Sequence, residues 1–160
     1  MAQTSAAKEW QPPPVRVMRA ANRVIVPLLN SPLHGIASKR LMLLEFTGRK
    51  TGRRYVVPVA YHDWADGEVF AVSTRPTWPR NLRGGQPVRL RIRGRWRQAK
   101  PVITEDPTEV ADLLGEFVAR NGPGPTGKLR IGLPTDRVPT REELLVAGGR
   151  VRAGRFRFVN

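Results

Sequence analysis

Short apolar or alternating runs, separated by Gly, Asp or Pro turn signals, dominate the middle of the chain and predict β-strands. These runs are Leu41–Thr47, Tyr55–Tyr61, Val69–Thr74, Val88–Arg93 and Trp96–Thr104, and a last strand is predicted over Val151–Val159. The intervals between the central runs are too short for crossover helices, so we expect the strands to pair antiparallel as hairpins. Within Val88–Arg93 every second residue is aliphatic and the others are all arginine, which predicts one core face and one cationic face.

An amphipathic basic helix is predicted near the N-terminus. From Val15 onward apolar residues recur at helical spacing while arginines fill the remaining arc, and we expect the helix to bend or end near Pro27. Such a helix usually covers the end of a barrel, although docking on a membrane surface or closing over a site stays open. Residues 1–14 are polar and then proline-rich, so a mobile tail is expected before a single domain over residues 15–160.

Two further helices are predicted after the central strands. Asp106-Pro107 supplies an N-cap and a first-position proline, and Asn121-Gly122 ends that helix. Thr140 and Glu143 have the spacing of a capping box, while the basic, Gly/Pro-rich residues 122–132 are expected to form a loop. An antiparallel sheet with a few peripheral helices is an α+β arrangement, and we predict a six-stranded barrel.

Charge narrows the choice of ligand but does not settle it. The formal net charge is +15, and residues 69–104 contain nine Lys or Arg and no Asp or Glu. Such a field attracts nucleic acid, anionic lipid and phosphorylated coenzymes alike.

Several kinds of chemistry are disfavoured by what the chain lacks. There is no cysteine, and only His34 and His62 could serve as imidazole ligands, so we predict neither disulfides nor a metal site. No P-loop, Rossmann fingerprint or catalytic-triad spacing is visible. If the protein is an enzyme, the reactive group is therefore expected to belong to a bound cofactor.

No secretory signal is visible, and no run reaches the ~18 apolar residues that a membrane span requires. We therefore expect a cytoplasmic protein, with peripheral membrane contact through the N-terminal helix left open.

The segment Gly48–Arg54 (GRKTGRR) is the clearest candidate site. It carries four cationic side chains on a Gly-bounded turn, and both these charges and the backbone N–H groups favour an anion. The alternative is a solvated hairpin tip.

Around this turn, the segments Leu43–Arg53, Pro58–Tyr61 and Val72-Ser73, together with Trp78 and Asn81-Leu82, resemble the deazaflavin-dependent nitroreductase family. Members of this family are split β-barrel oxidoreductases, similar in fold to flavin reductases and pyridoxamine-phosphate oxidases, that use coenzyme F-420. The resemblance extends from about Arg16 to the C-terminus, and its central block is the specific part. It implies a split barrel and a reductase that depends on this coenzyme.

The resemblance also implies a coenzyme site. The basic turn would hold the phosphate and oligoglutamate tail, Pro58–Tyr61 would lie along the deazaflavin ring, and Trp78 would pack the following loop. The residues implied to bind the coenzyme are Lys50, Thr51, Arg53, Arg54, Pro58, Val59, Ala60, Tyr61, Ser73, Thr74, Trp78, Arg80 and Asn81. Trp78 could instead be a core anchor, and Asn81 could cap a helix beginning at Leu82.

The implied reaction is hydride transfer from C5 of the reduced coenzyme to a quinone-like, nitro or other conjugated acceptor. Tyr61 is the candidate catalytic proton donor, with packing in the barrel as its alternative role. The loop Thr74–Pro79 is shorter than in better-characterised nitroreductase members, and the chain has only two tyrosines. A quinone or another conjugated acceptor is therefore preferred to a nitroimidazole.

Other functions remain open at this point. The same cations could hold flavin mononucleotide or heme, or the barrel could only sequester such a ligand. A nucleic-acid-binding barrel could use the arginines of residues 89–97 with Trp96, but the low aromatic content of 7% disfavours it. The oligomeric state is not predicted.

Overall fold

The computed structural model describes residues 15–30 and 40–159, and for residues 15–22 it describes the backbone alone. The predicted mobile tail over residues 1–14 lies outside the described residues. The division into a tail and one domain over residues 15–160 stays a prediction.

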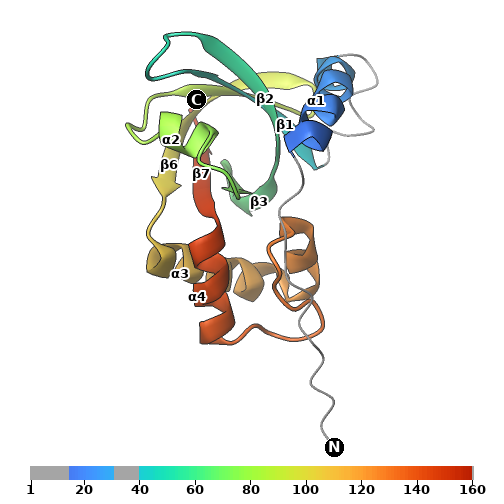
Figure 1. Ribbon diagram of the computed structural model, residues 1–160, viewed down its shortest axis with the longest axis vertical. Helices are drawn as coiled ribbons and strands as arrows, with labels where there is room; N and C mark the ends of the chain where they lie inside the picture. Colours follow the sequence, from blue (N-terminus) through green and yellow to red (C-terminus); the bar gives the residue numbers. More distant parts are fainter. Residues whose placement is uncertain (1–14, 31–39, 160) are drawn as a thin grey trace, which may run out of the picture.

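The strands form one antiparallel, seven-stranded sheet in the order β2-β1-β5-β6-β7-β4-β3. Their bounds are β1 Leu41–Thr47, β2 Arg54–Ala60, β3 His62–Ala65, β4 Glu68–Ser73, β5 Val88–Ile92, β6 Arg95–Thr104 and β7 Arg152–Phe158. The sheet curls into a half-barrel (Figure 1). As a result β2 lies in contact with β4, although no backbone ladder joins them.

The predicted count of six strands is wrong, because the sheet contains a seventh. Strand β3 follows β2 after Tyr61 alone and pairs with β4 through an irregular register between Asp63 and Ala65. Its four residues are too few to show a period-2 pattern, and the Asp66-Gly67 turn follows directly. The α+β class and the antiparallel barrel-like sheet are confirmed.

The described helices are α1 Val15–Asn30, α2 Trp78–Asn81, α3 Pro107–Asn121, the 3-10 helix η2 Gly124–Leu129 and α4 Arg141–Arg150. Helix α1 continues through Pro27, so of the two expected outcomes, a bend or an end, the end does not occur. The Asp106 side chain caps α3, and Thr140 forms the predicted capping box of α4. None of the described helices is long and apolar enough to cross a membrane.

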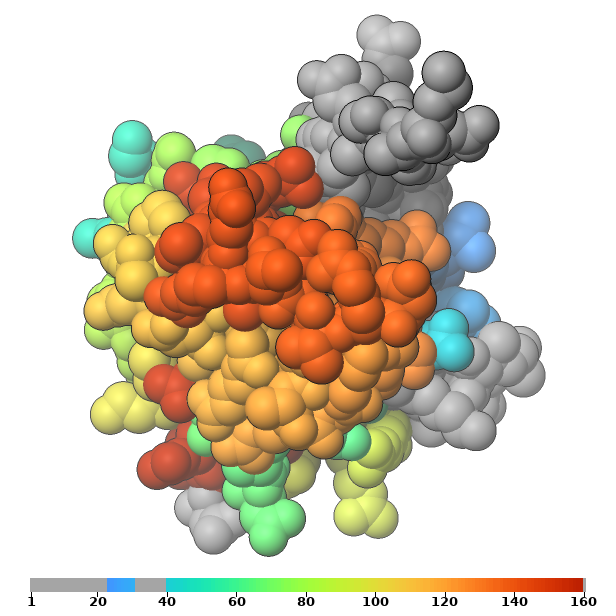
Figure 2. All heavy atoms as spheres, turned by 90° about the horizontal axis from the view of Figure 1, so that it is seen from below, coloured from blue at the N-terminus to red at the C-terminus, as the bar shows by residue number. Residues whose placement is uncertain are grey.

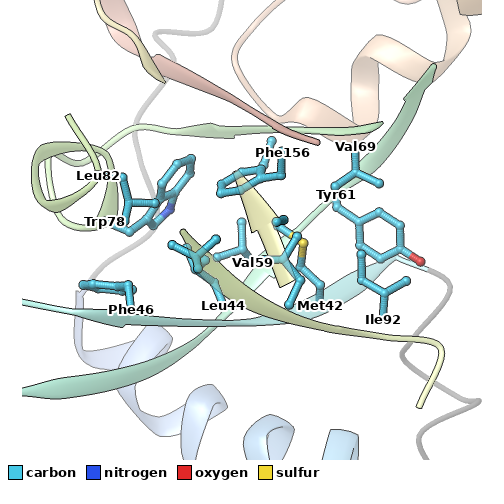
Figure 3. Packing of buried hydrophobic residues seen from close by; sticks show 14 residues of the cluster. Met42, Leu44, Phe46, Val59, Tyr61, Val69, Trp78, Leu82, Ile92 and Phe156 are labelled. Atoms are coloured by element: carbon cyan, nitrogen blue, oxygen red, sulfur yellow. The ribbon is translucent and has the colours of Figure 1, made fainter. Parts of the chain in front are cut away.

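Two hydrophobic clusters lie on opposite faces of the sheet. The concave face of the half-barrel encloses Met42, Leu44, Phe46, Val59, Tyr61, Val69, Ala71, Trp78, Leu82, Val88, Leu90, Ile92, Ala99 and Phe156 (Figure 3). The second cluster packs Trp64 and Phe70 of the sheet against α3, α4 and the segment between them. These later elements form the face of the molecule shown in Figure 2.

The buried side chain of Trp78 packs helix α2 against the barrel core. The indole is 5% exposed and its ring centroid lies 5.7 Å from that of Phe156. Gly154 gives the ring its space, since a Cβ there would lie 2.9 Å from Trp78 Cζ3. Trp78 is therefore a core anchor, and Asn81 ends α2 instead of capping a helix at Leu82.

Candidate functional site

The basic turn, residues Gly48–Arg54, is built by two glycines. The Gly48 N–H donates to the Arg53 carbonyl at 2.7 Å, and the Gly52 N–H donates to the Gly48 carbonyl at 2.9 Å. Gly52 has a φ of +67°, and a Cβ at Gly48 would lie 2.7 Å from Thr51 Oγ1. The glycines thus let the chain turn tightly between β1 and β2.

A hydrogen bond from the backbone joins the basic turn to α2. The Arg49 N–H donates to Asn81 Oδ1 at 2.9 Å, and Asn81 Nδ2 donates to the Thr77 carbonyl at 2.9 Å. Both ends of the Asn81 amide are therefore used within the protein. Asn81 fixes the position of the turn relative to the core residue Trp78.

The cations of the turn differ in their partners. Arg54 Nη2 lies 3.2 Å from Glu45 Oε2, whose other oxygen lies 3.4 Å from Arg89 Nη1. Within residues 15–30 and 40–159, no ion pair involves Lys50, Arg53 or the exposed Arg80 on α2. These three side chains carry uncompensated positive charge at one end of the barrel, which suits a phosphate or carboxylate ligand.

The four residues implied to lie along a ring, Pro58–Tyr61, occupy the end of β2 and the position after it. Val59 and Tyr61 are buried on the concave face, Pro58 is half-buried and Ala60 is exposed. In the described sheet β2 pairs only with β1, so its second edge carries backbone groups without a ladder partner. An edge strand also tolerates the missing N–H of Pro58.

Ser73 and Thr74, at the end of β4, are half-buried. The Ser73 hydroxyl donates to the Arg75 carbonyl at 2.7 Å and accepts from the Arg75 N–H at 3.2 Å. This hydroxyl therefore shapes the start of the loop that leads to α2.

Tyr61 lies at the far end of the concave core from Trp78, and its hydroxyl points away from the other labelled side chains (Figure 3). Burial raises the pKa of Tyr61, while the neighbouring Arg93 guanidinium, which hydrogen-bonds it, acts in the opposite direction. Arg93 Nη2 in turn lies 3.6 Å from Asp63 Oδ2. The phenol is therefore protonated at neutral pH and is available as a hydrogen donor.

Beyond Tyr61 lies a cavity of about 750 Å³. It is lined by Arg40, Leu41, Ala60, Tyr61, His62, Asp63, Phe117, Asn121, Pro125, Gly127, Lys128, Leu129 and Arg130. Burial, followed by the charge of Lys128, lowers the pKa of His62, which is neutral at pH 7. Of these lining residues, only Ala60 and Tyr61 were predicted from the sequence to belong to a site. For the others, the basic composition of residues 122–132 was the one sequence feature that could have indicated a binding site.

The predicted site residues thus lie in two places connected by β2. The cations, Thr51 and Asn81 gather where the basic turn meets α2, whereas Ala60 and Tyr61 open onto the cavity. The seven residues of β2 cover about 20 Å at the usual rise of a strand. An elongated ligand with one anionic end and one flat end fits this arrangement.

The outer face of β5 carries exposed or half-buried arginines, as predicted, opposite buried Val88, Leu90 and Ile92. Arg89 is paired with Glu45, and Arg91 Nη1 donates to Asn30 Oδ1 of α1 at 3.2 Å. The Arg89 guanidinium also lies 4.8 Å from the centroid of Trp96. Trp96 already stacks within the protein, which leaves a poor platform for nucleic-acid bases.

The family to which the sequence belongs defines the class of the protein as a deazaflavin-dependent oxidoreductase. The sequence matches the model of the F420H(2)-dependent quinone reductase family over residues 16–122. The chain belongs to this family, which confirms the resemblance seen in the sequence. It is an F-420-dependent reductase, its cofactor is coenzyme F-420 and its substrate is a small molecule.

No curated protein matches the sequence significantly. Similar solved structures include a protein described as a domain-swapped dimer, with 14% identity, a TM-score of 0.48 and coverage of 90% of this chain and 99% of that one. An F420-H2 dependent reductase (FDR-A) has 15% identity, a TM-score of 0.45 and coverage of 74% and 94%. The heme storage protein HutZ from Vibrio cholerae has 13% identity, a TM-score of 0.47 and coverage of 82% and 91%. Similarities this low carry no inference about ligand or assembly.

Proposed function

We propose that the enzyme reduces a quinone or another conjugated acceptor at the end of β2, with coenzyme F-420 held between the basic turn and Tyr61. The coenzyme, when bound, supplies a hydride. The observation that carries the proposal is the pairing of a turn with four cations, of which Arg54 alone has an ion pair in the described part of the chain, with a cavity about one strand length, or about 20 Å, away.

The basic turn would hold the anionic part of the coenzyme. Lys50, Arg53 and Arg80 offer charge that no ion pair among the described residues uses, and Thr51 adds a hydroxyl. Arg54 would add positive charge to the site while it keeps its ion pair with Glu45. Asn81 would act indirectly, by holding the turn against α2.

The ring would lie along β2 near the end of β4. Pro58, Val59 and Ala60 would supply backbone groups and one strand face, because the second edge of β2 is unpaired in the described sheet. Ser73 and Thr74 would border the ring from β4, with Trp78 supporting the loop from within the core.

Tyr61 would act as the proton donor. Reduction of a quinone by one hydride leaves a negative charge on oxygen, and one further proton completes the quinol. Burial raises the pKa of Tyr61 and keeps the phenol protonated, so its proton can pass to the acceptor oxygen and be replaced from solvent.

Peripheral membrane contact through α1 is a further part of the proposal, for a lipophilic acceptor. It is supported by Val24, which is 68% exposed beside the exposed Arg23. Location in the cytoplasm stays a prediction.

The proposal is tested by titrating the purified chain with oxidised coenzyme F-420 and with flavin mononucleotide while following fluorescence. We expect binding of the first and none of the second. Lys50→Ala and Arg53→Ala should each weaken coenzyme binding by about tenfold, since each removes a charge-assisted hydrogen bond. Lys100→Ala, which removes an exposed cation of β6, is the matched control. Unchanged affinity in the turn variants, or preferred binding of flavin mononucleotide or heme, would contradict the proposal.

A further inference from the structure

The lining of the cavity beyond Tyr61 is more basic than a pocket for a neutral quinone requires. Three of its side chains, Arg40, Lys128 and Arg130, are cationic and exposed at its surface. Among the described residues that line it, Asp63 is the one acidic residue, and its carboxylate lies 3.6 Å from Arg93. The cavity therefore has an excess of positive charge.

Part of the cavity lining is apolar and offers a contact surface to a flat ring. Phe117 and Leu129 are buried members of the second hydrophobic cluster, and Leu41 is half-buried. The His62 ring meets Phe117 edge to face, with the centroids 5.1 Å apart, and it stays neutral because burial lowers its pKa. At about 750 Å³ the cavity has room for a bicyclic molecule and its substituents.

We infer that this cavity binds the electron acceptor, and that the acceptor is an aromatic or quinonoid acid whose anionic group meets Lys128 and its basic neighbours. Ala60 and Tyr61 belong both to the proposed ring segment and to the cavity lining. A molecule held here therefore lies next to the proposed ring segment. The assignment as acceptor rests on the proposed function, whereas the preference for an anionic ring rests on the cavity alone.

Two non-reducible probes of similar shape, one anionic and one neutral, show how much the charge of the ligand contributes to its affinity. We would measure binding of 2-naphthoate and of its neutral counterpart 2-naphthamide by isothermal titration calorimetry, with the protein first free of and then saturated with oxidised coenzyme F-420. The carboxylate should bind about fivefold more tightly than the amide at low salt, which is the upper end of the range for one exposed charge pair. Saturation with the coenzyme should leave this binding in place.

The Lys128→Gln variant tests the position of the charge. It should remove most of the preference for 2-naphthoate, whereas Lys100→Gln on the distant strand β6 should keep it. Lys50→Ala should weaken coenzyme binding without changing the affinity for naphthoate, because the basic turn lies at the other end of β2.

The outcomes separate the two proposals. Equal affinity of the two probes for the wild-type chain, an unchanged preference in Lys128→Gln, or displacement of naphthoate by the coenzyme would each overturn the inference. Failure of coenzyme F-420 to bind would instead contradict the proposed function, while the naphthoate preference of the coenzyme-free protein would stand.

Discussion

At the scale of single residues, some side chains of the candidate site have no ion pair in the described part of the chain, whereas others bind neighbouring protein groups. Arg54 shares Glu45 with Arg89, and the Asn81 amide accepts from the Arg49 N–H and donates to the Thr77 carbonyl. Residues with these two roles look alike in the sequence motif. Their partners become visible only when the chain folds, so loss of activity on substituting Asn81 would not show direct contact with the coenzyme.

Replacing Tyr61 by Phe separates the two roles of this residue. The ring would keep its place in the barrel core, whereas the hydroxyl that we propose as the proton donor would be lost. We expect turnover of a quinone to fall by about a hundredfold, the scale of one general acid, with unchanged affinity for the coenzyme. Steady-state kinetics and the fluorescence titration measure the two effects.

Tyr55→Phe is the matched control for this substitution. Tyr55 is 38% exposed and its hydroxyl lies 3.3 Å from Thr51 Oγ1, far along β2 from the cavity. Equal loss of turnover in the two variants would exclude a special role for Tyr61.

At the scale of elements, the strands with clear alternation were predicted with ends correct to one residue, because burial on one face imposes a period of two. Strand β3 was missed because four residues cannot display that period. The 3-10 helix over Gly124–Leu129 was also missed, since two glycines and a proline within six residues are typical of a loop.

The candidate site was predictable where its residues are neighbours in sequence. The basic turn and Pro58–Tyr61 lie on one hairpin and stand out as a motif. The cavity lining comes from Arg40, the β2–β3 junction, α3 and the η2 segment, which only the tertiary fold brings together. Single basic residues such as Lys128 give no sign of a pocket in a chain of this charge.

The capping box of α4 predicts a pH dependence of stability. The Thr140 N–H donates to Glu143 Oε2 at 2.8 Å, and Arg137 Nη1 donates to the same oxygen at 2.8 Å. The ion pair with Arg137, followed by the bond from Thr140, lowers the pKa of Glu143 to about 2. The folded state therefore favours the carboxylate more than the unfolded state does.

We expect Glu143→Gln to lower the melting temperature by a constant amount above pH ~4.3, the ordinary value for Glu. The difference from wild type should shrink as the pH falls from there towards the folded pKa of about 2. Thermal unfolding between these limits measures it. Glu142→Gln, an exposed change in the same helix, should show no such trend, and a parallel trend in both would refute the role of the capping box.

At the scale of the whole molecule, the net charge of +15 should steer anionic ligands to the protein. Raising the ionic strength from about 0.01 M to about 1 M shortens the Debye length from about 30 Å to about 3 Å. We expect the association rate of coenzyme F-420 to fall at least tenfold over this range, as measured by stopped-flow fluorescence. A rate that does not depend on salt would mean that only short-range contacts govern capture.

The hydrogen bond from Arg49 to Asn81 connects the basic turn, the proposed site for the anionic part of the coenzyme, to α2 and through Trp78 to the interior of the barrel. A ligand that holds the turn must then also oppose opening of the barrel, because its binding free energy adds to that of unfolding. The protein without coenzyme is accordingly the form most exposed to chaperones and proteases. In a cell, the abundance of this enzyme should follow the supply of its coenzyme even at a constant rate of synthesis.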